Sequence, residues 1–119
     1  MSDLTDRERD FWLKGGDHFR DHADPGAVYV VPKEDGILDH AAAADIIARE
    51  GRWDRVEMGQ VYEQDLGGGI TVLTYPATGH RGEAVYRALC STIYRDGRLV
   101  HHQQTPLGAP EGPAPVPRG

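Results

Sequence analysis

The side chains best suited to acid–base chemistry lie near the C-terminal end of the sequence, where His101 and His102 stand in a run typical of a β-strand. Side chains alternate between the faces of a strand, so His102 shares a face with Val100 and Gln104, and His101 points the other way. Desolvation on such a face lowers the basicity of an imidazole, which otherwise titrates near neutral pH. We predict His102 as a catalytic base or acid. The alternatives are a core histidine bonded to a backbone carbonyl or to a dimer partner, and a reversed alternation that gives the role to His101.

A second candidate for proton transfer is the carboxylate of Asp17, which lies about one turn beyond Trp12 in a predicted N-terminal helix. An isomerase or cyclase needs a carboxylate or histidine base in a dry pocket, together with a donor that stabilises an enolate. We therefore predict Asp17 as a second catalytic residue at a pocket mouth. The alternative is a surface or helix-capping role.

Aromatic side chains and one amide are the candidate ligand-binding residues. Aromatic walls and donors suit a flat or polycyclic ligand, although aromatic side chains also pack in cores and interfaces. Tyr29, Tyr62 or Gln104 would orient a carbonyl oxygen of the ligand. The full predicted ligand-binding set is Trp12, Tyr29, Trp53, Tyr62, Tyr86 and Gln104.

We expect no metal and no cofactor. His18 and His22 are four residues apart on the predicted helix, but the sequence lacks the glutamate that follows the first histidine in metalloproteases. The run 67–69 is all glycine, yet neither a lysine nor a helix follows it, so it predicts a hairpin connection and not a phosphate loop. Cys90 has no signature of a nucleophile and is expected to be a buried apolar residue.

Composition limits the possible partners and location. The chain has 119 residues, a net charge of −6 and a single cysteine. An acidic chain without a basic stripe is a poor nucleic-acid binder, and no apolar run approaches a signal peptide or a membrane span. One cysteine allows no internal disulfide, which suits a reducing compartment. We expect a soluble, cytoplasmic protein that binds neither nucleic acid nor membrane.

A hairpin near the C-terminus is the strongest structural signal. Residues 83–94 and 99–107 are rich in strand-forming side chains, and Asp96-Gly97 stands at the bend between them. On the first arm, alternation places Tyr86 and Tyr94 on one face together with Ala88, Cys90 and Thr92.

The rest of the chain predicts two helices followed by strands, which is an α+β class. Thr5 and Glu8 form a capping-box pattern that opens a helix over 6–22, with a costly glycine pair at 15–16 where the helix kinks or a neighbour approaches. Further predicted elements are a strand at 27–32, a helix at 40–50 between Asp39 and Gly51, strands at 55–64 and 70–77, and a turn at 78–82. Residues 1–107 form the predicted domain, and the Pro/Gly-rich residues 108–119 a disordered or extended tail.

Six short stretches resemble a known family when they are taken in order. They are Phe11-Trp12, Gly16-Asp17, and residues 28–32, 36–39, 53–56 and 99–106. Over residues 4–107 their order and spacing resemble SnoaL-like and DUF4440-like members of the NTF2-like superfamily. One departure is Arg98, which stands near the place where such proteins often have a tryptophan.

The resemblance implies an NTF2-like (cystatin-like) cone, in which a curved antiparallel sheet wraps around N-terminal helices and encloses a pocket. It also implies a homodimer formed through the open sheet face. Such proteins include isomerases, cyclases, dehydratases and non-catalytic modules, and fold alone does not choose among them. The expected function is binding of a small, largely apolar molecule with proton-transfer chemistry. The alternatives are ligand binding without chemistry and a dimeric assembly module.

Overall fold

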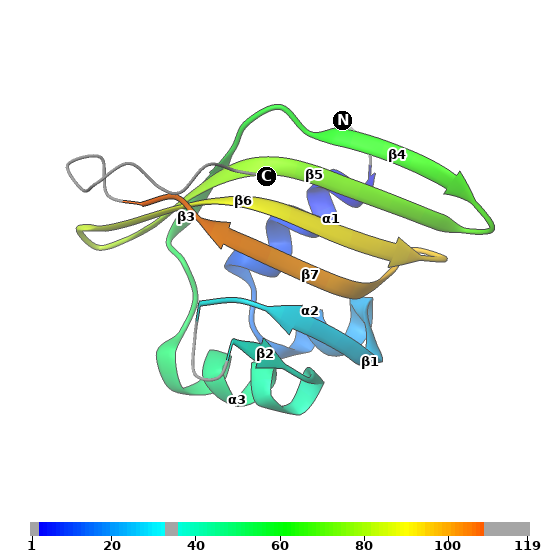
Figure 1. The fold of residues 1–119 in the computed structure, drawn as a ribbon. Helices are drawn as coiled ribbons and strands as arrows, with labels where there is room; N and C mark the ends of the chain where they lie inside the picture. Colours follow the sequence, from blue (N-terminus) through cyan, green and yellow to red (C-terminus); the bar gives the residue numbers. More distant parts are fainter. Residues whose placement is uncertain (1–2, 33–35, 109–119) are drawn as a thin grey trace.

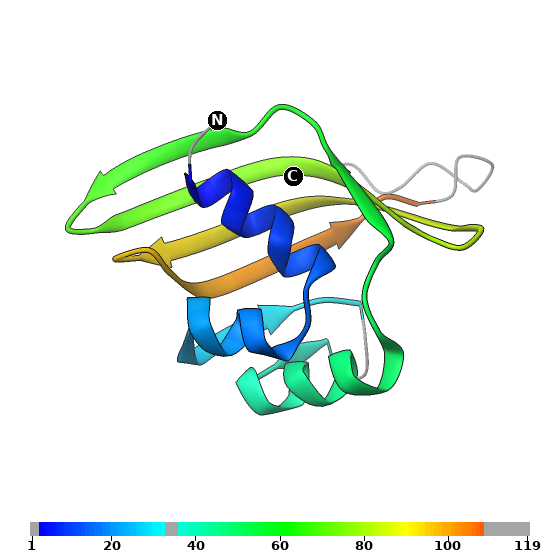
Figure 2. The same ribbon diagram turned by 180° about the vertical axis from the view of Figure 1, so that it is seen from behind.

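A curved β-sheet forms the framework of the computed structural model, which describes residues 3–32 and 36–108. Helices lie together on one side of this sheet, where α1 crosses several strands (Figure 2). The elements, in chain order, are α1 (Asp3–Leu13), α2 (Gly16–His22), β1 (Ala23–Val30), β2 (Ile37–Leu38), α3 (His40–Glu50), β3 (Arg55–Met58), β4 (Tyr62–Gly67), β5 (Ile70–Arg81), β6 (Ala84–Arg95) and β7 (Arg98–Pro106). The predicted α+β class is confirmed.

The strand order is β2-β1-β7-β6-β5-β3, and β4 pairs with the half of β5 that β3 leaves open (Figure 1). All neighbours are antiparallel except β1 and β7, which run parallel. The sheet is therefore mixed, whereas the sequence predicted an antiparallel one. Parallel neighbours cannot be joined by a hairpin, and β1 and β7 are indeed separated in the chain by all the other strands.

The β6–β7 hairpin is confirmed at its turn. Asp96 and Gly97 have φ angles of 51° and 82°, which a two-residue type I′ turn requires at both central positions. Glycine adopts such a φ without steric cost, and aspartate tolerates it better than most residues. The turn sets a register in which Thr92 of β6 lies opposite His102 of β7.

An irregularity in β7 changes the predicted alternation. Tyr94 pairs with Leu99, whereas its neighbour Ile93 pairs with His101, so β7 contains one extra residue at this point. A bulge of this kind reverses the side-chain parity beyond it. As a result Leu99 and His102 are both buried on the inner face, although strict alternation had placed them on opposite faces.

The predicted strand 55–64 is two strands, β3 and β4, and this break moves Tyr62. Met58 pairs with Ala77 and Tyr62 with Thr74. The chain therefore advances four residues between these two pairs, whereas β5 advances only three. The extra residue reverses parity. Tyr62 therefore lies on the outer face and is 59% exposed, which corrects its predicted inward orientation.

The predicted helix over 6–22 is interrupted at Gly15. This residue has an extended backbone, with φ −90° and ψ −156°, and it precedes the first residue of α2. Nothing lies within 4 Å of a Cβ built on Gly15 or on Gly16, so no close neighbour compensates for glycine in a helix. The weak helix propensity of glycine then favours the break.

The capping-box interpretation of Thr5 and Glu8 is wrong. Helix α1 already runs from Asp3, so both residues lie inside it, and both side chains are buried. The carboxylate of Glu8 is completely inaccessible to solvent. A carboxylate in such a place needs strong hydrogen-bond donors, and these are described below.

Helix α3 agrees with its prediction at both ends. The main-chain N–H of Ala42 donates to Asp39 Oδ1 at 2.8 Å, and Gly51 ends the helix with a φ of 79°. Its inward residues pack on the sheet beside Phe11, Trp12, Phe19 and Leu99 in one apolar core. In the described part of the chain no helix has the length and apolar character to cross a bilayer. Residues 33–35 and nearly all of the predicted tail, residues 109–119, lie outside the described residues.

Candidate functional site

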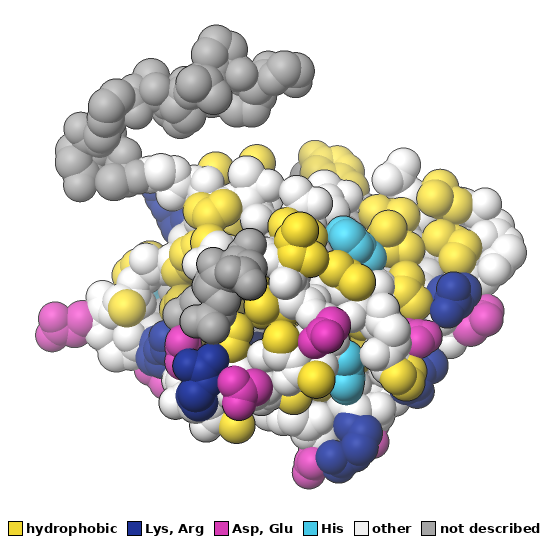
Figure 3. Space-filling view, turned by 60° about the horizontal axis from the view of Figure 1, so that its bottom comes forward, with side chains coloured by type: hydrophobic (Ala, Val, Ile, Leu, Met, Phe, Trp, Pro, Cys, Tyr) yellow, Lys and Arg dark blue, Asp and Glu magenta, His cyan; other side chains and the backbone are white. Residues whose placement is uncertain are grey.

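A cavity of about 330 Å³ lies between the helices and the inner face of the sheet. Its walls are mainly aromatic and aliphatic, and its lining residues with polar groups include Tyr29, Glu50, Arg52, Arg81, Tyr86, His102 and Gln104. Figure 3 shows hydrophobic side chains gathered across the middle of the face on the α3 and β2 side, with charged side chains mostly around them. The volume is at the lower end of the range of about 300–1,000 Å³ that is typical of small-molecule sites.

Behind the cavity wall, Glu8 accepts hydrogen bonds from three buried hydroxyls. Tyr94 donates to Oε1 at 2.8 Å, Thr92 donates to Oε2 at 2.6 Å, and Tyr75 also donates to Oε2. Burial raises the pKa of Glu8, but interactions with His102 and the hydroxyl bonds outweigh it, and the pKa is lowered overall. Glu8 is therefore a buried carboxylate held in its charged form.

His102 connects this carboxylate to the cavity. Its Nδ1 lies 2.6 Å from Thr92 Oγ1 and 3.3 Å from Glu8 Oε2. Thr92 has a single hydroxyl hydrogen, which it donates to Glu8, so His102 Nδ1 carries the hydrogen of the bond to Thr92. On the cavity side, His102 Nε2 lies 3.1 Å from Gln104 Nε2, an N–H donor. In this arrangement the lone pair of His102 Nε2 accepts from Gln104 on the cavity side.

The orientation of the Gln104 amide depends on Tyr86. The Tyr86 hydroxyl donates to Gln104 Oε1 at 2.9 Å, which turns the amide nitrogen toward His102. Burial and the nearby Cys90 raise the pKa of Tyr86 to about 12, so this hydroxyl keeps its proton at neutral pH. One hydrogen-bonded chain thus leads from Tyr86 through Gln104, His102 and Thr92 to Glu8.

Tyr29 supplies a donor that the protein does not use. It lies beside His102 in the pairing of β1 with β7 and lines the cavity. Its hydroxyl is buried and has no hydrogen-bond partner within the described part of the chain. Burial and the charge of Glu8 raise the pKa of Tyr29, so the phenol stays protonated. Since a buried hydroxyl without a partner costs free energy, a ligand oxygen is a suitable acceptor.

Three aromatic rings form one wall of the cavity. Trp53 and Tyr86 stack with centroids 5.6 Å apart and an interplanar angle of 14°, and Trp12 lies 6.1 Å from Trp53. The Trp12 indole N–H donates to the Tyr75 hydroxyl at 3.1 Å, which links this wall to Glu8. Gly79 makes room for Trp53, because a Cβ at that position would lie 2.9 Å from the indole.

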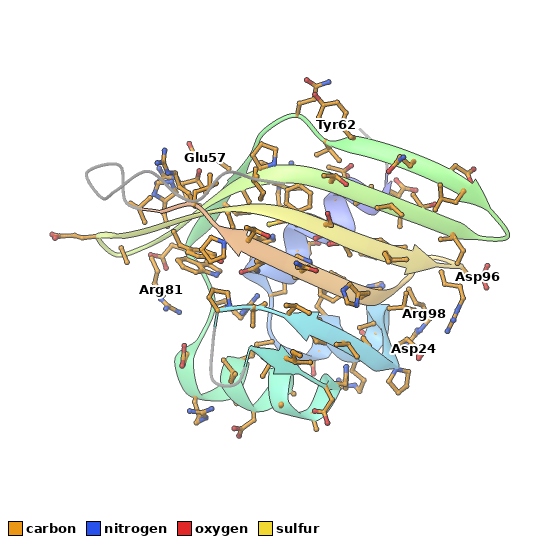
Figure 4. The ribbon with its side chains drawn as sticks, in the orientation of Figure 1. Asp24, Glu57, Tyr62, Arg81, Asp96 and Arg98 are labelled. Carbon is orange, nitrogen blue, oxygen red and sulfur yellow. The ribbon has the colours of Figure 1, made fainter. Side chains whose placement is uncertain are left out.

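The structure places six of the eight predicted site residues together. These six line the cavity: Trp12, Tyr29, Trp53, Tyr86, His102 and Gln104. Tyr62 is outside it, on β4, where its side chain points away from the helices (Figure 4). Asp17 is also outside, because the break at Gly15 carries it onto an exposed part of α2, where it pairs with Arg20 at 2.6 Å.

Sequence reasoning missed Glu8, Arg52 and Arg81. Glu8 precedes Phe11 by three residues and Trp12 by four, which puts it on the apolar stripe of the helix. That spacing was the signal for an inward carboxylate, but the capping-box pattern competed with it. No local pattern distinguishes the two arginines from other surface arginines.

Cys90, His18 and His22 lie outside the lining of the cavity. Cys90 is buried, and burial with the charge of Glu8 raises the pKa of its thiol to about 12. His18 and His22 lie with ring centroids 4.6 Å apart, and His18 contacts the main-chain oxygen of Arg7. Among the described residues, no group of three or more potential ligands is arranged to hold a metal ion.

Comparison with solved structures identifies the fold. A ketosteroid isomerase-like protein from Parabacteroides distasonis superposes with a TM-score of 0.72 at 15% identity, over 87% of this chain and 85% of its own. An NTF2-like protein of unknown function from Prochlorococcus gives 0.72 at 15% identity, over 92% and 96%. One from Pseudomonas aeruginosa gives 0.66 at 22% identity, over 88% and 93%. The sequence matches no family model and no curated protein.

The protein therefore has the NTF2-like fold, an α+β cone, as its sequence predicted. Identities this low show the fold alone. The narrower resemblance to SnoaL-like and DUF4440-like proteins remains a prediction, and the function depends on the side chains of the cavity.

Proposed function

We propose that the protein binds a small, largely apolar molecule in this cavity and moves a proton on it, with His102 as the base. The observation that carries the proposal is a histidine in an apolar wall whose outer nitrogen faces the cavity and whose inner nitrogen is backed by Thr92 and Glu8. A positioned base next to a buried carboxylate is the arrangement expected for general acid–base catalysis.

The proposed reaction uses the hydrogen positions assigned above to His102, Gln104 and Tyr86. A C–H bond next to a ligand carbonyl breaks, its proton moves to His102 Nε2, and the electron pair passes into an enolate. Glu8 stabilises the imidazolium that forms. Gln104 must turn its amide to present oxygen to the new N–H, and the Tyr86 hydroxyl can then accept where it previously donated. Returning the proton to another carbon atom of the ligand completes an isomerisation. Passing it instead to a hydroxyl on the β-carbon, whose C–O bond breaks as the enolate collapses, releases water and completes a dehydration.

Tyr29 is the proposed donor to the developing enolate oxygen. Its hydroxyl is buried, protonated and available, and it lies on the strand next to His102. Donors already aimed at the atom where charge develops stabilise the transition state without reorganisation. Trp53 and Tyr86, which belong to the aromatic wall, would hold a flat ligand so that it reaches toward His102 and Tyr29.

A model ketone tests the proposal without knowledge of the natural ligand. In D₂O, the α-protons of 2-tetralone exchange for deuterium when a base removes them, which proton NMR follows directly. We expect the wild-type protein to accelerate this exchange and His102→Gln to abolish the acceleration. The matched control is His101→Gln, since His101 is the neighbouring histidine and does not line the cavity; it should keep the wild-type rate.

Native mass spectrometry of the purified protein provides the complementary observation, because a retained small molecule of defined mass would show that the cavity is a binding site. Binding of 2-tetralone without faster exchange would contradict the catalytic proposal and leave the binding function. That result would favour the alternative, a ligand-binding module without chemistry.

We also propose that two copies of the chain associate through the outer face of the sheet. On this face Val85 and Leu89 of β6 are 60% and 49% exposed, and Tyr62, two strands away on β4, is 59% exposed. Leu89 is flanked by Pro76 and Thr105 on the neighbouring strands. Exposed apolar residues grouped on a sheet face are typical of an interface. A single buried cysteine is consistent with the cytoplasmic location that we propose for this dimer.

A further inference from the structure

The cavity carries two arginines that the proposed proton transfer does not use. Arg52 follows α3 and Arg81 ends β5, and both line the cavity together with Glu50 and Gly51. Glu50 and Gly51 are exposed, so this end of the cavity opens to solvent. Burial and the charge of Arg81 lower the pKa of Arg52 to about 10. Arg52 is therefore charged at neutral pH, and the two guanidinium groups repel each other.

The protein holds these arginines in place through neutral groups. Arg52 donates to the main-chain oxygens of Lys14, at 2.9 Å, and Phe11, and its guanidinium lies 5.6 Å from the ring centroid of Phe19. Arg81 donates to the main-chain oxygen of Glu50 at 3.1 Å and stands 4.9 Å over the Trp53 ring. A guanidinium has more N–H donors than these contacts use. Both side chains are thus positioned, with donors left over.

The charges of the two arginines are not matched by ion pairs among the described residues, although Glu50 lines the same end of the cavity. Within the described part of the chain, no ion pair joins Arg52 or Arg81 to a carboxylate, whereas Arg9, Arg20 and Arg49 each pair with an aspartate. Two half-buried cations beside an apolar cavity favour an anion that arrives with the ligand.

We propose that the ligand is an amphiphilic carboxylate, with an aromatic or cyclic body in the cavity and its carboxylate at Arg52 and Arg81. The inference rests on the proposed function, because it uses the same cavity and adds the charged end of the ligand. Planar guanidinium groups match a carboxylate well and hold it in a defined orientation. The apolar body then lies along Trp53 and Tyr86, with its far part toward His102 and Tyr29.

The test compares two probes of nearly the same shape, 2-naphthoate and the neutral 2-naphthamide, by isothermal titration calorimetry. The wild-type protein should bind the carboxylate roughly tenfold more tightly than the amide, because hydrogen bonds to charged groups are stronger than neutral ones. Added sodium chloride should weaken binding of the carboxylate and leave that of the amide unchanged.

Two variants test whether Arg81 causes the preference for the carboxylate over the amide. Arg81→Met should bring the two affinities close together while leaving binding of the amide nearly unchanged. The control Arg87→Met removes an exposed arginine of β6 that does not line the cavity, and it should keep the preference. Because each variant is judged by the ratio of two affinities, partial unfolding, which would reduce both, cannot imitate the result.

Glu50→Gln tests whether the counter-charge of the two arginines comes from the ligand or from Glu50. If the ligand supplies their counter-charge, this variant keeps the preference for the carboxylate or increases it; a reduced preference would overturn the proposal. Equal binding of the two probes to the wild type, with no effect of Arg81→Met, would also overturn it and leave cavity binding intact. If the wild type binds neither probe, both this inference and the proposed binding of aromatic molecules fail.

Discussion

At the scale of residues, one buried carboxylate organises the polar part of this cavity. Glu8 is completely buried and accepts from Tyr75, Tyr94 and Thr92, which lie on two different strands. Breaking such a network by removing one partner is costly, whereas fully bonded it fixes a single arrangement. The result is a His102 whose inner nitrogen is committed to the network, so that only its outer nitrogen is available for chemistry.

Tyr29→Phe separates the function of this tyrosine from folding. Its hydroxyl has no partner among the described residues, so removing it should leave the free energy of unfolding in urea unchanged or slightly higher. Exchange of 2-tetralone should slow by roughly tenfold or more, because one donor to the enolate oxygen is lost. Tyr62→Phe, on the outer face, should change neither quantity. A marked loss of stability in Tyr29→Phe would show that the hydroxyl has a structural role instead.

At the scale of elements, the positions of the site residues depend on two places where one strand gains a residue. The extra residue in β7 lets Leu99 and His102 share the inner face, and the one between β3 and β4 turns Tyr62 outward. The shared face that alternation predicts for His102 and Gln104 is found in the structure, because both line the cavity, and the catalytic role of His102 stays a prediction. Tyr62 was misplaced because the sequence contains no clear signal for where a strand is interrupted.

The same reasoning explains which elements could be predicted from the sequence. The β6–β7 turn and helix α3 carry local signals, Asp96-Gly97 and the pair Asp39 and Gly51, and both were found. The network around Glu8 joins residues more than 60 positions apart, and no local pattern encodes such contacts. Asp17 was misassigned because the glycine pair predicts a possible break in the helix but not the direction of the segment that follows it.

Gly79→Ala tests how closely the sheet holds the aromatic wall. An added Cβ would lie 2.9 Å from the Trp53 indole, so Trp53 must move or β5 must bend. We expect a loss of about 1–3 kcal/mol in the free energy of unfolding, as for other overpacked sites, together with a changed tryptophan fluorescence spectrum. Gly15→Ala is the control, since open space surrounds that position. An unchanged spectrum and stability in Gly79→Ala would contradict the described packing.

At the scale of the whole molecule, the cone separates two surfaces with different proposed partners. The inner face holds the cavity, whereas the outer face presents Val85, Leu89 and Tyr62. Arg81 stands at the end of the sheet opposite Asp24 and Arg98 (Figure 4), so the proposed anion site is at one end of the cone and leaves the outer face free for a second copy. Ligand binding and association can therefore be tested separately.

Leu89→Lys should disrupt the proposed dimer. A lysine in the middle of an apolar interface would bury a charge without a partner, which is strongly unfavourable. Sedimentation equilibrium should show a dimer for the wild type and a monomer for the variant at the same concentration, with unchanged far-UV circular dichroism. Ile37→Lys alters a more exposed residue at the β2 edge of the sheet, three strands away from β6, and should remain dimeric. A monomeric wild type would refute the dimer.

The pH dependence of the free energy of unfolding should show the titration of Glu8. Its pKa is lowered in the folded protein because, despite burial, His102 and the hydroxyls favour the carboxylate. A depressed folded-state pKa adds stability that is fully present above the unfolded-state pKa, about 4.3 for glutamate, and that is lost as the pH falls through the folded-state value. Urea unfolding between pH 7 and pH 3 should therefore show a decline in the free energy of unfolding that begins near pH 5.

Glu8→Gln removes that titration, and its comparison with the wild type isolates the contribution of Glu8. The variant should be less stable at pH 7 by about 3 kcal/mol, as expected when one partner of a buried ionic network is lost. Its stability should then fall less steeply below pH 5, so that the two curves approach each other in acid. The exposed Glu63→Gln on β4 should follow the wild-type curve. Parallel curves for the wild type and Glu8→Gln would mean that Glu8 is uncharged in the folded protein, which would also remove the support that it gives to His102 as a base.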